Sequence, residues 1–238
     1  MTLARTVHPE TLDGLAEDDP RAIRSRRDLQ RVNRVMGTRG IVLRGLRDAV
    51  DMRARTSPLR VLELGAGDGS LMLAIAKRLA PAWPAVELTL LDRQRLVDEK
   101  TIAAFAKLGW RAQGLNVDVL DWIGDDAPQR FDAIVTNLFL HHFDERSLPS
   151  LLRAIGERGG AFFACEPRRA ALALAGSHLI GALLVNAVTR EDAVLSVHAG
   201  FRDDELSVLW PREPQLWTLR EYPAGLFSHC FSAKREAR

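Results

Sequence analysis

The sequence feature with the clearest chemical meaning is a loop of three glycines spaced two apart. It reads "GAGDG" at 65–69 and directly follows the apolar run "RVLEL" at 60–64. Glycines between a buried strand and a helix let the backbone approach a nucleotide closely. Ligands of parallel sheets bind at the carboxyl ends of the strands. We therefore expect this loop to hold a ligand of nucleotide size.

Glu63, two residues before the first glycine, argues against a dinucleotide as that ligand. The dinucleotide-binding loop has the spacing G-x-G-x-x-G/A, whereas the spacing here is G-x-G-x-G with Ser70 next. A carboxylate beside the loop would also repel a pyrophosphate, and it favours a cation. The following helix N-terminus favours an anion. S-adenosylmethionine meets both demands, because it carries a sulfonium, an ammonium and a carboxylate but no phosphate.

The stretch "VLELGAGDGSL" at 61–71 resembles the first motif of the class I S-adenosylmethionine-dependent methyltransferases. The resemblance extends from about residue 58 to the C-terminus, and its finer form is to small-molecule methyltransferases of the quinone-biosynthesis type. It implies S-adenosylmethionine as the cofactor and S-adenosylhomocysteine as the product.

The same resemblance assigns the cofactor site. Asp92, which ends "LTLLD", matches the acid that binds both ribose hydroxyls, and Asp118 matches the residue that meets the adenine amino group. Val119 offers a backbone N–H to the ring, and Asn137 and Leu138 lie beside the methionine moiety. Each acid also has an alternative, purely structural role: Asp92 as the cap of the next helix and Asp118 as a turn residue. The expected cofactor-binding set is Glu63, Gly65, Ala66, Gly67, Gly69, Asp92, Arg93, Asp118, Val119, Asn137 and Leu138.

Two histidines that follow the expected fourth strand, His141 and His142, are the candidate catalytic residues. Methyl transfer from a sulfonium needs positioning and, for an oxygen nucleophile, a base. Histidine titrates near neutrality and can take that proton, although a structural histidine bonded to the cofactor loop is the alternative. The stretch "TNLFLHHF" at 136–143 has no carboxylate before Asp144, so we expect no metal. It also lacks the Pro-Pro-aromatic tetrad of enzymes that methylate adenine N6 or glutamine amides.

Apolar runs and helical patterns alternate along the chain and must position these residues. This alternation predicts a Rossmann-like, doubly wound, mostly parallel α/β sheet. A C-terminal antiparallel hairpin across 223–225 completes seven strands, after a short helix at 203–210. The other expected strands are 60–64, 86–92, 112–119, 131–137 and 159–167, and the expected helices are 70–80, 98–109 and 147–157.

We expect two parts in the chain, an N-terminal helical arm or cap at 1–57 and a methyltransferase domain at 58–238. Within the second part, the apolar stretch 170–188 is expected to form one cap helix. A membrane span is disfavoured there, because it would place the preceding strand and the closing hairpin on opposite sides of a bilayer. Its apolarity, after Arg168 and Arg169, indicates a hydrophobic aromatic substrate and transient contact with a membrane surface. Packing against the N-terminal helices is the alternative.

The net charge, the cysteine count and the N-terminal residues limit the expected binding partners and the expected cellular compartment. The formal net charge of +2 is too small to require nucleic acid, although 21–35 is rich in arginine. The two cysteines form neither a zinc site nor a disulfide framework, and the N-terminus has no apolar signal region. We therefore expect a cytoplasmic protein.

These observations lead to one prediction and several alternatives. We expect methyl transfer to a hydroxyl, or to a ring carbon, of a hydrophobic phenol or quinol. The alternatives are an RNA methyltransferase that uses the arginine-rich arm and a protein that binds the cofactor without turnover. A nicotinamide reductase is opposed by Glu63 and by the loop spacing.

Overall fold

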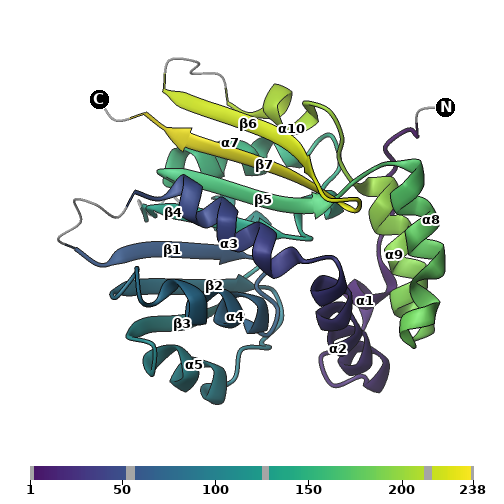
Figure 1. The fold of residues 1–238 in the computed structure, drawn as a ribbon, viewed down its shortest axis with the longest axis horizontal. Helices are drawn as coiled ribbons and strands as arrows, with labels where there is room; N and C mark the ends of the chain where they lie inside the picture. The colour runs from purple at the N-terminus through teal and green to yellow at the C-terminus, as the bar shows by residue number, and fades with distance from the viewer. Residues whose placement is uncertain (1–2, 52–56, 125–128, 212–215, 237–238) are drawn as a thin grey trace.

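The computed structural model describes residues 3–51, 57–124, 129–211 and 216–236, and a seven-stranded sheet forms its centre (Figure 1). The strand order is β3-β2-β1-β4-β5-β7-β6. Strands β1 to β5 pair in parallel, and β7 pairs antiparallel with both β5 and β6. The doubly wound sheet with its C-terminal hairpin is thus confirmed. The strands are β1 (Leu59–Leu64), β2 (Val86–Asp92), β3 (Trp110–Asn116), β4 (Ala133–Asn137), β5 (Ala161–Pro167), β6 (Trp217–Ala224) and β7 (Ser228–Arg235).

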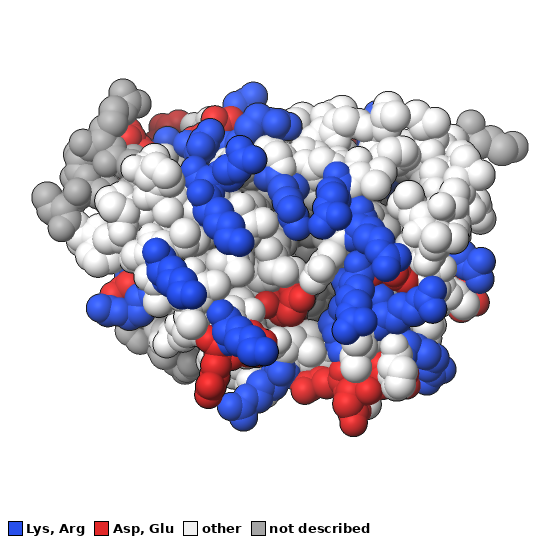
Figure 2. Space-filling view, turned by 60° about the horizontal axis from the view of Figure 1, so that its bottom comes forward, with Lys and Arg blue, Asp and Glu red and all other residues white. Residues whose placement is uncertain are grey.

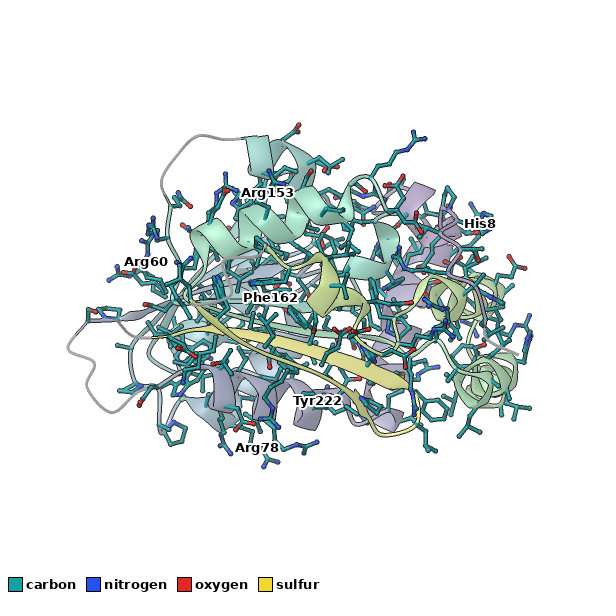
Figure 3. The ribbon with its side chains drawn as sticks, turned by 90° about the horizontal axis from the view of Figure 1, so that it is seen from above. His8, Arg60, Arg78, Arg153, Phe162 and Tyr222 are labelled. Carbon is teal, nitrogen blue, oxygen red and sulfur yellow. The ribbon has the colours of Figure 1, made fainter. Side chains whose placement is uncertain are left out.

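Helices cover both faces of this sheet and form one apolar core on each. Helices α3, α4 and α5 pack on one face, and the core there contains Phe163 of β5 and Phe105 of α5. Helices α6, α7 and α10 pack on the other face, and the core there contains Phe162 of β5. Figure 3 shows Phe162 on the α7 side of the sheet and Tyr222 on the opposite side. The bounds are α3 (Thr38–Ala49), α4 (Ser70–Leu79), α5 (Glu99–Ala106), α6 (Val119–Gly124), α7 (Leu148–Arg158) and α10 (Glu205–Leu209).

The N-terminal helices lie in two different places. Gly37 has a φ of 70° and separates α2 (Pro20–Val35) from α3. Helix α3 packs directly on β5, where a Cβ on Gly45 would lie 2.2 Å from the Phe163 ring. Helix α2 instead lies beyond the carboxyl ends of the strands, near α8 and α9 (Figure 1).

The stretch 170–188 is not the single helix that its apolar composition predicts. It forms α8 (Ala171–Leu179) and the short 3-10 helix η2 (Ile180–Leu183), and α9 (Ala187–Ala199) then begins. Leu184 has a left-handed φ of 56°, and the Asn186 side chain accepts a hydrogen bond from the Thr189 N–H at the start of α9. The Asn186 N–H also donates to buried Asp28 of α2 at 2.8 Å. The chain therefore turns here, and α8 and α9 form a helical hairpin.

The start of the chain, residues 3–17, crosses the carboxyl edge of the sheet; we call it the N-terminal segment. It contains the short helix α1 (Thr11–Gly14). The Arg5 guanidinium donates to the carbonyls of Ala199 and Phe143, each at 2.8 Å. At the other end, the Leu15 carbonyl accepts from the Gln94 side chain. The segment thus runs from α9 to the loop after β2. Within the described ranges, every helix is too short or too polar to cross a bilayer.

Candidate cofactor site and active site

The glycine loop after β1 has the backbone geometry that only glycine adopts without strain. Gly65, Gly67 and Gly69 have φ values of 70°, 56° and 73°. A Cβ on Gly65 would also lie 2.3 Å from the Phe139 ring, so this position excludes any side chain. The loop leads into α4 at Ser70, and Gly69 is the N-cap of this helix.

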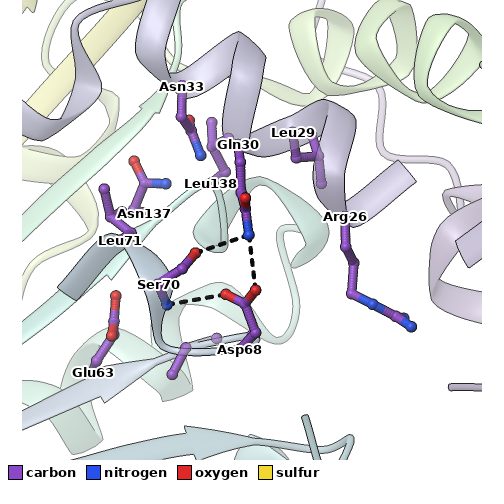
Figure 4. Close-up of a pocket in the computed structure, with 13 residues that line it drawn as sticks. Arg26, Leu29, Gln30, Asn33, Glu63, Asp68, Ser70, Leu71, Asn137 and Leu138 are labelled. Atoms are coloured by element: carbon purple, nitrogen blue, oxygen red, sulfur yellow. Dashed lines mark hydrogen bonds between the residues drawn. The ribbon is translucent and has the colours of Figure 1, made fainter. Parts of the chain in front are cut away.

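A cavity of about 160 Å³ lies against this loop (Figure 4). Its floor comes from the loop, Glu63 and the end of β4, and its roof comes from α2. Six of the expected cofactor residues line it, together with seven residues outside the expected cofactor set. The former are Glu63, Gly65, Ala66, Gly67, Asn137 and Leu138; the latter are Arg26, Leu29, Gln30, Asn33, Asp68, Ser70 and Leu71.

Two buried oxygen atoms in this cavity lack a hydrogen-bond donor among the described residues. They are Oε2 of Glu63 and Oδ1 of Asn137. Burial and the nearby charges of Asp92 and Asp68 raise the pKa of Glu63 to about 8. Figure 4 shows both side chains turned toward the space under α2. The site therefore offers acceptors to a ligand that carries N–H donors and positive charge.

Asp92 ends β2 beside the loop, as its expected role requires. Its carboxylate accepts from the Gly67 N–H at 2.8 Å and from the Gln94 N–H at 2.9 Å. Burial raises the pKa of Asp92, although these two hydrogen bonds oppose the shift. Arg93 points elsewhere, because its guanidinium binds the carbonyl and the carboxylate of Asp13 in the N-terminal segment. Asp92 is thus placed beside the loop, whereas Arg93 holds the segment that crosses it.

Asp118 and Val119 follow β3 and belong to the start of α6. The Asp118 carboxylate accepts from the Leu120 N–H at 2.8 Å. This bond fits the alternative role of Asp118 as a turn residue. Val119 is buried in the core on the α7 face. Neither residue is among the described residues that line the cavity, so their contacts with an adenine ring stay a prediction.

His141 is buried between two carboxylates, which is unfavourable for a general base. Its Nδ1 lies 2.9 Å from Glu166 and its Nε2 lies 3.3 Å from Glu10. Burial lowers the pKa of His141, but the hydrogen bonds and charges of the two glutamates outweigh burial and raise it to about 9. With both ring nitrogens engaged, His141 has no free lone pair for a substrate proton. These contacts oppose the expectation that His141 is the base, which stays a prediction.

His142 is the more accessible of the two histidines. Its side chain is 24% exposed, and its Nδ1 lies 3.2 Å from the Asp13 carboxylate. Burial raises the pKa of Asp13, but the hydrogen bond from His142, together with the charges of the two histidines and Arg93, outweighs burial and lowers it below its usual value. A histidine held by a carboxylate on one nitrogen is the usual arrangement of a base or of a metal ligand.

Helix α2 closes the cavity through Gln30. The Gln30 amide donates to Asp68 at 2.8 Å and to the Ser70 hydroxyl at 3.2 Å (Figure 4). Asp68 of the glycine loop thus fixes α2 to this loop. No local pattern marks Gln30 as a site residue, because its contact lies 38 residues away in the chain.

The fold and the glycine loop together define a Rossmann-like methyltransferase fold, and comparison with known proteins agrees. Residues 62–158 match the family described as "Methyltransferase domain". This match runs from β1 through α7, so that part of the chain is similar to a methyltransferase domain. No curated protein sequence matches the chain.

Solved structures share this fold at low sequence identity. An O-methyltransferase family protein from Burkholderia thailandensis has a TM-score of 0.61 and 17% identity, with 92% of this chain and 61% of that chain covered. Mitomycin 7-O-methyltransferase has a TM-score of 0.56 and 20% identity, with 94% and 60% covered. Magnesium protoporphyrin IX methyltransferase from Synechocystis, with bound S-adenosylhomocysteine, has a TM-score of 0.51 and 13% identity, with 94% and 91% covered. The chain thus spans about 60% of the length of the first two.

Proposed function

We propose that the protein binds S-adenosylmethionine in the cavity under α2 and transfers its methyl group to a hydroxyl of a hydrophobic phenol or quinol. The observation that carries the proposal is the pair of unpaired acceptors, Glu63 Oε2 and Asn137 Oδ1, beside the open glycine loop. An ammonium group would supply the missing donors. Asp92, at the neighbouring strand end, has carboxylate lone pairs left for ribose hydroxyls.

The cofactor supplies an activated methyl group, so the protein's task is to position the acceptor and to exclude water. Helix α2 and the N-terminal segment cover the carboxyl edge of the sheet and would shield the reacting atoms. Exposed leucines on the α8–α9 hairpin support a hydrophobic acceptor taken from a membrane surface. They are Leu172, Leu179 and Leu184, with 55%, 73% and 78% of their surface exposed.

A titration experiment tests the cofactor half of this proposal. Isothermal titration with S-adenosylmethionine should give micromolar binding, and Glu63→Ala and Asp92→Ala should each weaken it by roughly 10- to 100-fold through lost charge-assisted bonds. Glu87→Ala is the matched control, because Glu87 lies on the same strand as Asp92 but its side chain is 41% exposed and pairs with arginines. Unchanged affinity in both site variants would contradict the assignment.

The acceptor is tested by mass spectrometry of compounds that co-purify with the protein, followed by transfer of labelled methyl from S-adenosylmethionine to a panel of phenols and quinols. Transfer to a phenolic oxygen supports the proposal. Binding of the cofactor without transfer to any acceptor in the panel would favour the non-catalytic alternative.

A second candidate acceptor is RNA, favoured by the arginines of α2. Figure 2 shows Lys and Arg side chains gathered over one face of the molecule. The exposed arginines of α2 recur at helical spacing, at Arg24, Arg27, Arg31 and Arg34. If RNA is the substrate, its affinity should fall steeply between 50 and 200 mM salt, and a labelled oligonucleotide should accept methyl where phenols do not.

A further inference from the structure

Three side chains with metal-binding atoms, those of Glu10, His141 and His142, form one cluster, and the two histidines follow β4, the strand that ends at Asn137 of the cavity. One ligand atom from each lies within 4.8 Å of the others. The cluster joins distant parts of the chain, because Glu10 precedes α1 and the two histidines form the 3-10 helix η1 (Leu140–His142) after β4. Asp13 connects it to the cofactor site, since this carboxylate contacts both His142 and Arg93, the residue after Asp92.

Glu166 determines which nitrogen of His141 faces the cluster. The Glu166 carboxylate accepts from the backbone N–H groups of Phe139 and Leu140 and therefore needs a further donor, Nδ1–H of His141. With the proton on Nδ1, the Nε2 lone pair points at the Glu10 carboxylate, 3.3 Å away. Two acceptors facing each other need a cation between them. A proton satisfies this geometry, and so does a metal ion.

We propose that Glu10, His141 and His142 bind a divalent transition-metal ion such as Zn²⁺ or Mn²⁺. One carboxylate and two imidazoles form a ligand set that suits these ions. Two atoms each about 2.0–2.2 Å from one tetrahedral ion lie roughly 3.4 Å apart, close to the 3.3 Å between Nε2 and Oε1. The expectation of no metal considered only the sequence after β4, and Glu10 reaches the histidines from the N-terminal segment.

The surroundings of the cluster also fit a metal site. Carboxylates contact both imidazoles, Glu166 at Nδ1 of His141 and Asp13 at Nδ1 of His142, and such contacts are usual for metal-bound histidine. The Ser196 hydroxyl donates to Glu10 and fixes that carboxylate. Exposure rises across the cluster, from 3% for the His141 side chain to 12% for Glu10 and 24% for His142. Three protein ligands in a partly open site leave a coordination position for an outside oxygen.

This inference rests on the proposed function and deepens it. The open position would take an oxygen of the methyl acceptor, and the ion would lower the pKa of that hydroxyl. His142 would then act as a ligand, and the hydroxyl proton would pass to solvent water as the acceptor oxygen binds the ion, so no side chain would need to serve as the base. Acceptors that can bind a metal through oxygen, such as catechols and hydroxyquinones, are the substrate class that this site favours.

Metal titration of the full chain tests the site directly. Protein freed of metal with a chelator is titrated with ZnCl₂, MnCl₂ and MgCl₂ by calorimetry, and Co²⁺ is added as a visible-absorption probe of coordination geometry. We expect one equivalent of Zn²⁺ or Mn²⁺, binding of Mg²⁺ at least 10-fold weaker, and Co²⁺ absorption bands of a site with nitrogen ligands. Glu10→Gln and His142→Ala should each weaken binding 10- to 100-fold or more.

His178→Ala is the matched control, because His178 is an exposed histidine on α8 far along the chain from the cluster. It should retain the wild-type metal affinity. Both variants should still unfold cooperatively in the absence of metal, because Glu10→Gln preserves the shape of its side chain and His142 is partly exposed. No stoichiometric binding, or equal affinity in wild type, Glu10→Gln and His142→Ala, would overturn the proposal. Binding of S-adenosylmethionine by the metal-free protein is measured separately, so failure of the metal site and failure of the proposed function are distinguishable.

Discussion

At Glu63 the protein keeps a carboxyl group where burial disfavours its charge, and this makes stability depend on pH. The folded pKa of about 8 lies above the unfolded value near 4.5, so unfolding releases protons between these values. The stability contributed by the neutral form is full below pH 4.5 and is lost as the pH rises toward 8. We predict that Glu63→Gln, which cannot ionise, gains stability over the wild type by up to about 1.4 kcal/mol per pH unit in this window.

Urea unfolding at pH 5 and pH 8, without cofactor, measures this effect as the difference between variant and wild type. The difference cancels the titration of other groups. Asp132→Asn at the amino end of β4 is a useful comparison, because the Asp132 carboxylate accepts from the Arg60 N–H far from the cavity. A variant-minus-wild-type difference for Glu63→Gln that is equal at both pH values would show that this carboxyl does not titrate as described.

At the scale of elements, the close approach of α3 to β5 depends on one glycine. A Cβ on Gly45 would lie 2.2 Å from the Phe163 ring, which is itself buried in the sheet, so the helix or the ring must move. We predict that Gly45→Ala destabilises the fold by roughly 1–3 kcal/mol through overpacking. Gly40→Ala, one turn earlier in α3, meets only the flexible end of Arg44 at 3.4 Å and should be neutral or stabilising by up to about 1 kcal/mol. Thermal unfolding of both variants checks the contrast, and equal melting temperatures would refute it.

The N-terminal segment is held in place by Asp192 of α9. This carboxylate accepts from the Thr11 and Leu12 N–H groups at 2.8 and 3.0 Å, at the start of α1. We predict that Asp192→Ala frees residues 10–17, seen as faster hydrogen exchange there and unchanged exchange in β1 and β4. Glu191→Ala, an exposed neighbour on the same helix, should leave the segment protected. If Asp192→Ala exchanges like the wild type, other contacts such as those of Arg5 hold the segment.

The elements differ in how far the sequence predicts them. Local patterns suffice for the β–α alternation and for the break at Gly37, because both depend on neighbouring residues. The turn at Leu184 is hidden in an apolar run. An N-cap asparagine with a threonine three residues later was the available signal, and the tie from Asn186 to Asp28 across 158 residues completes the turn. The partners of His141 were out of reach for the same reason, since Glu10 lies 131 residues away.

For the whole molecule, the order of the motifs carries more information than any one residue. The glycine loop, Asp92 and Asn137 end three neighbouring strands, β1, β2 and β4, so the parallel sheet brings them to one edge. That consequence follows from βαβ topology alone. Helix α2 and the N-terminal segment cover this edge through side-chain contacts between segments far apart in the chain. The hydrophobic periodicity of the sequence does not predict such contacts.

A ligand bound in the cavity between α2 and the glycine loop should raise the melting temperature of the whole fold. A ligand at 100 times its dissociation constant stabilises the native state by about 2.7 kcal/mol, which for a chain of this size raises the melting temperature by roughly 5–10 °C. We predict such a shift with S-adenosylmethionine and with S-adenosylhomocysteine, and a smaller one in Glu63→Ala at the same concentration. NADH at equal concentration should give no shift, because the G-x-G-x-G spacing of the loop differs from the G-x-G-x-x-G/A spacing that holds a dinucleotide. A shift with NADH as large as that with S-adenosylmethionine would indicate that the glycine loop binds dinucleotides. A shift with neither would mean that α2, fixed to the loop through Gln30, keeps the cavity closed to nucleotides.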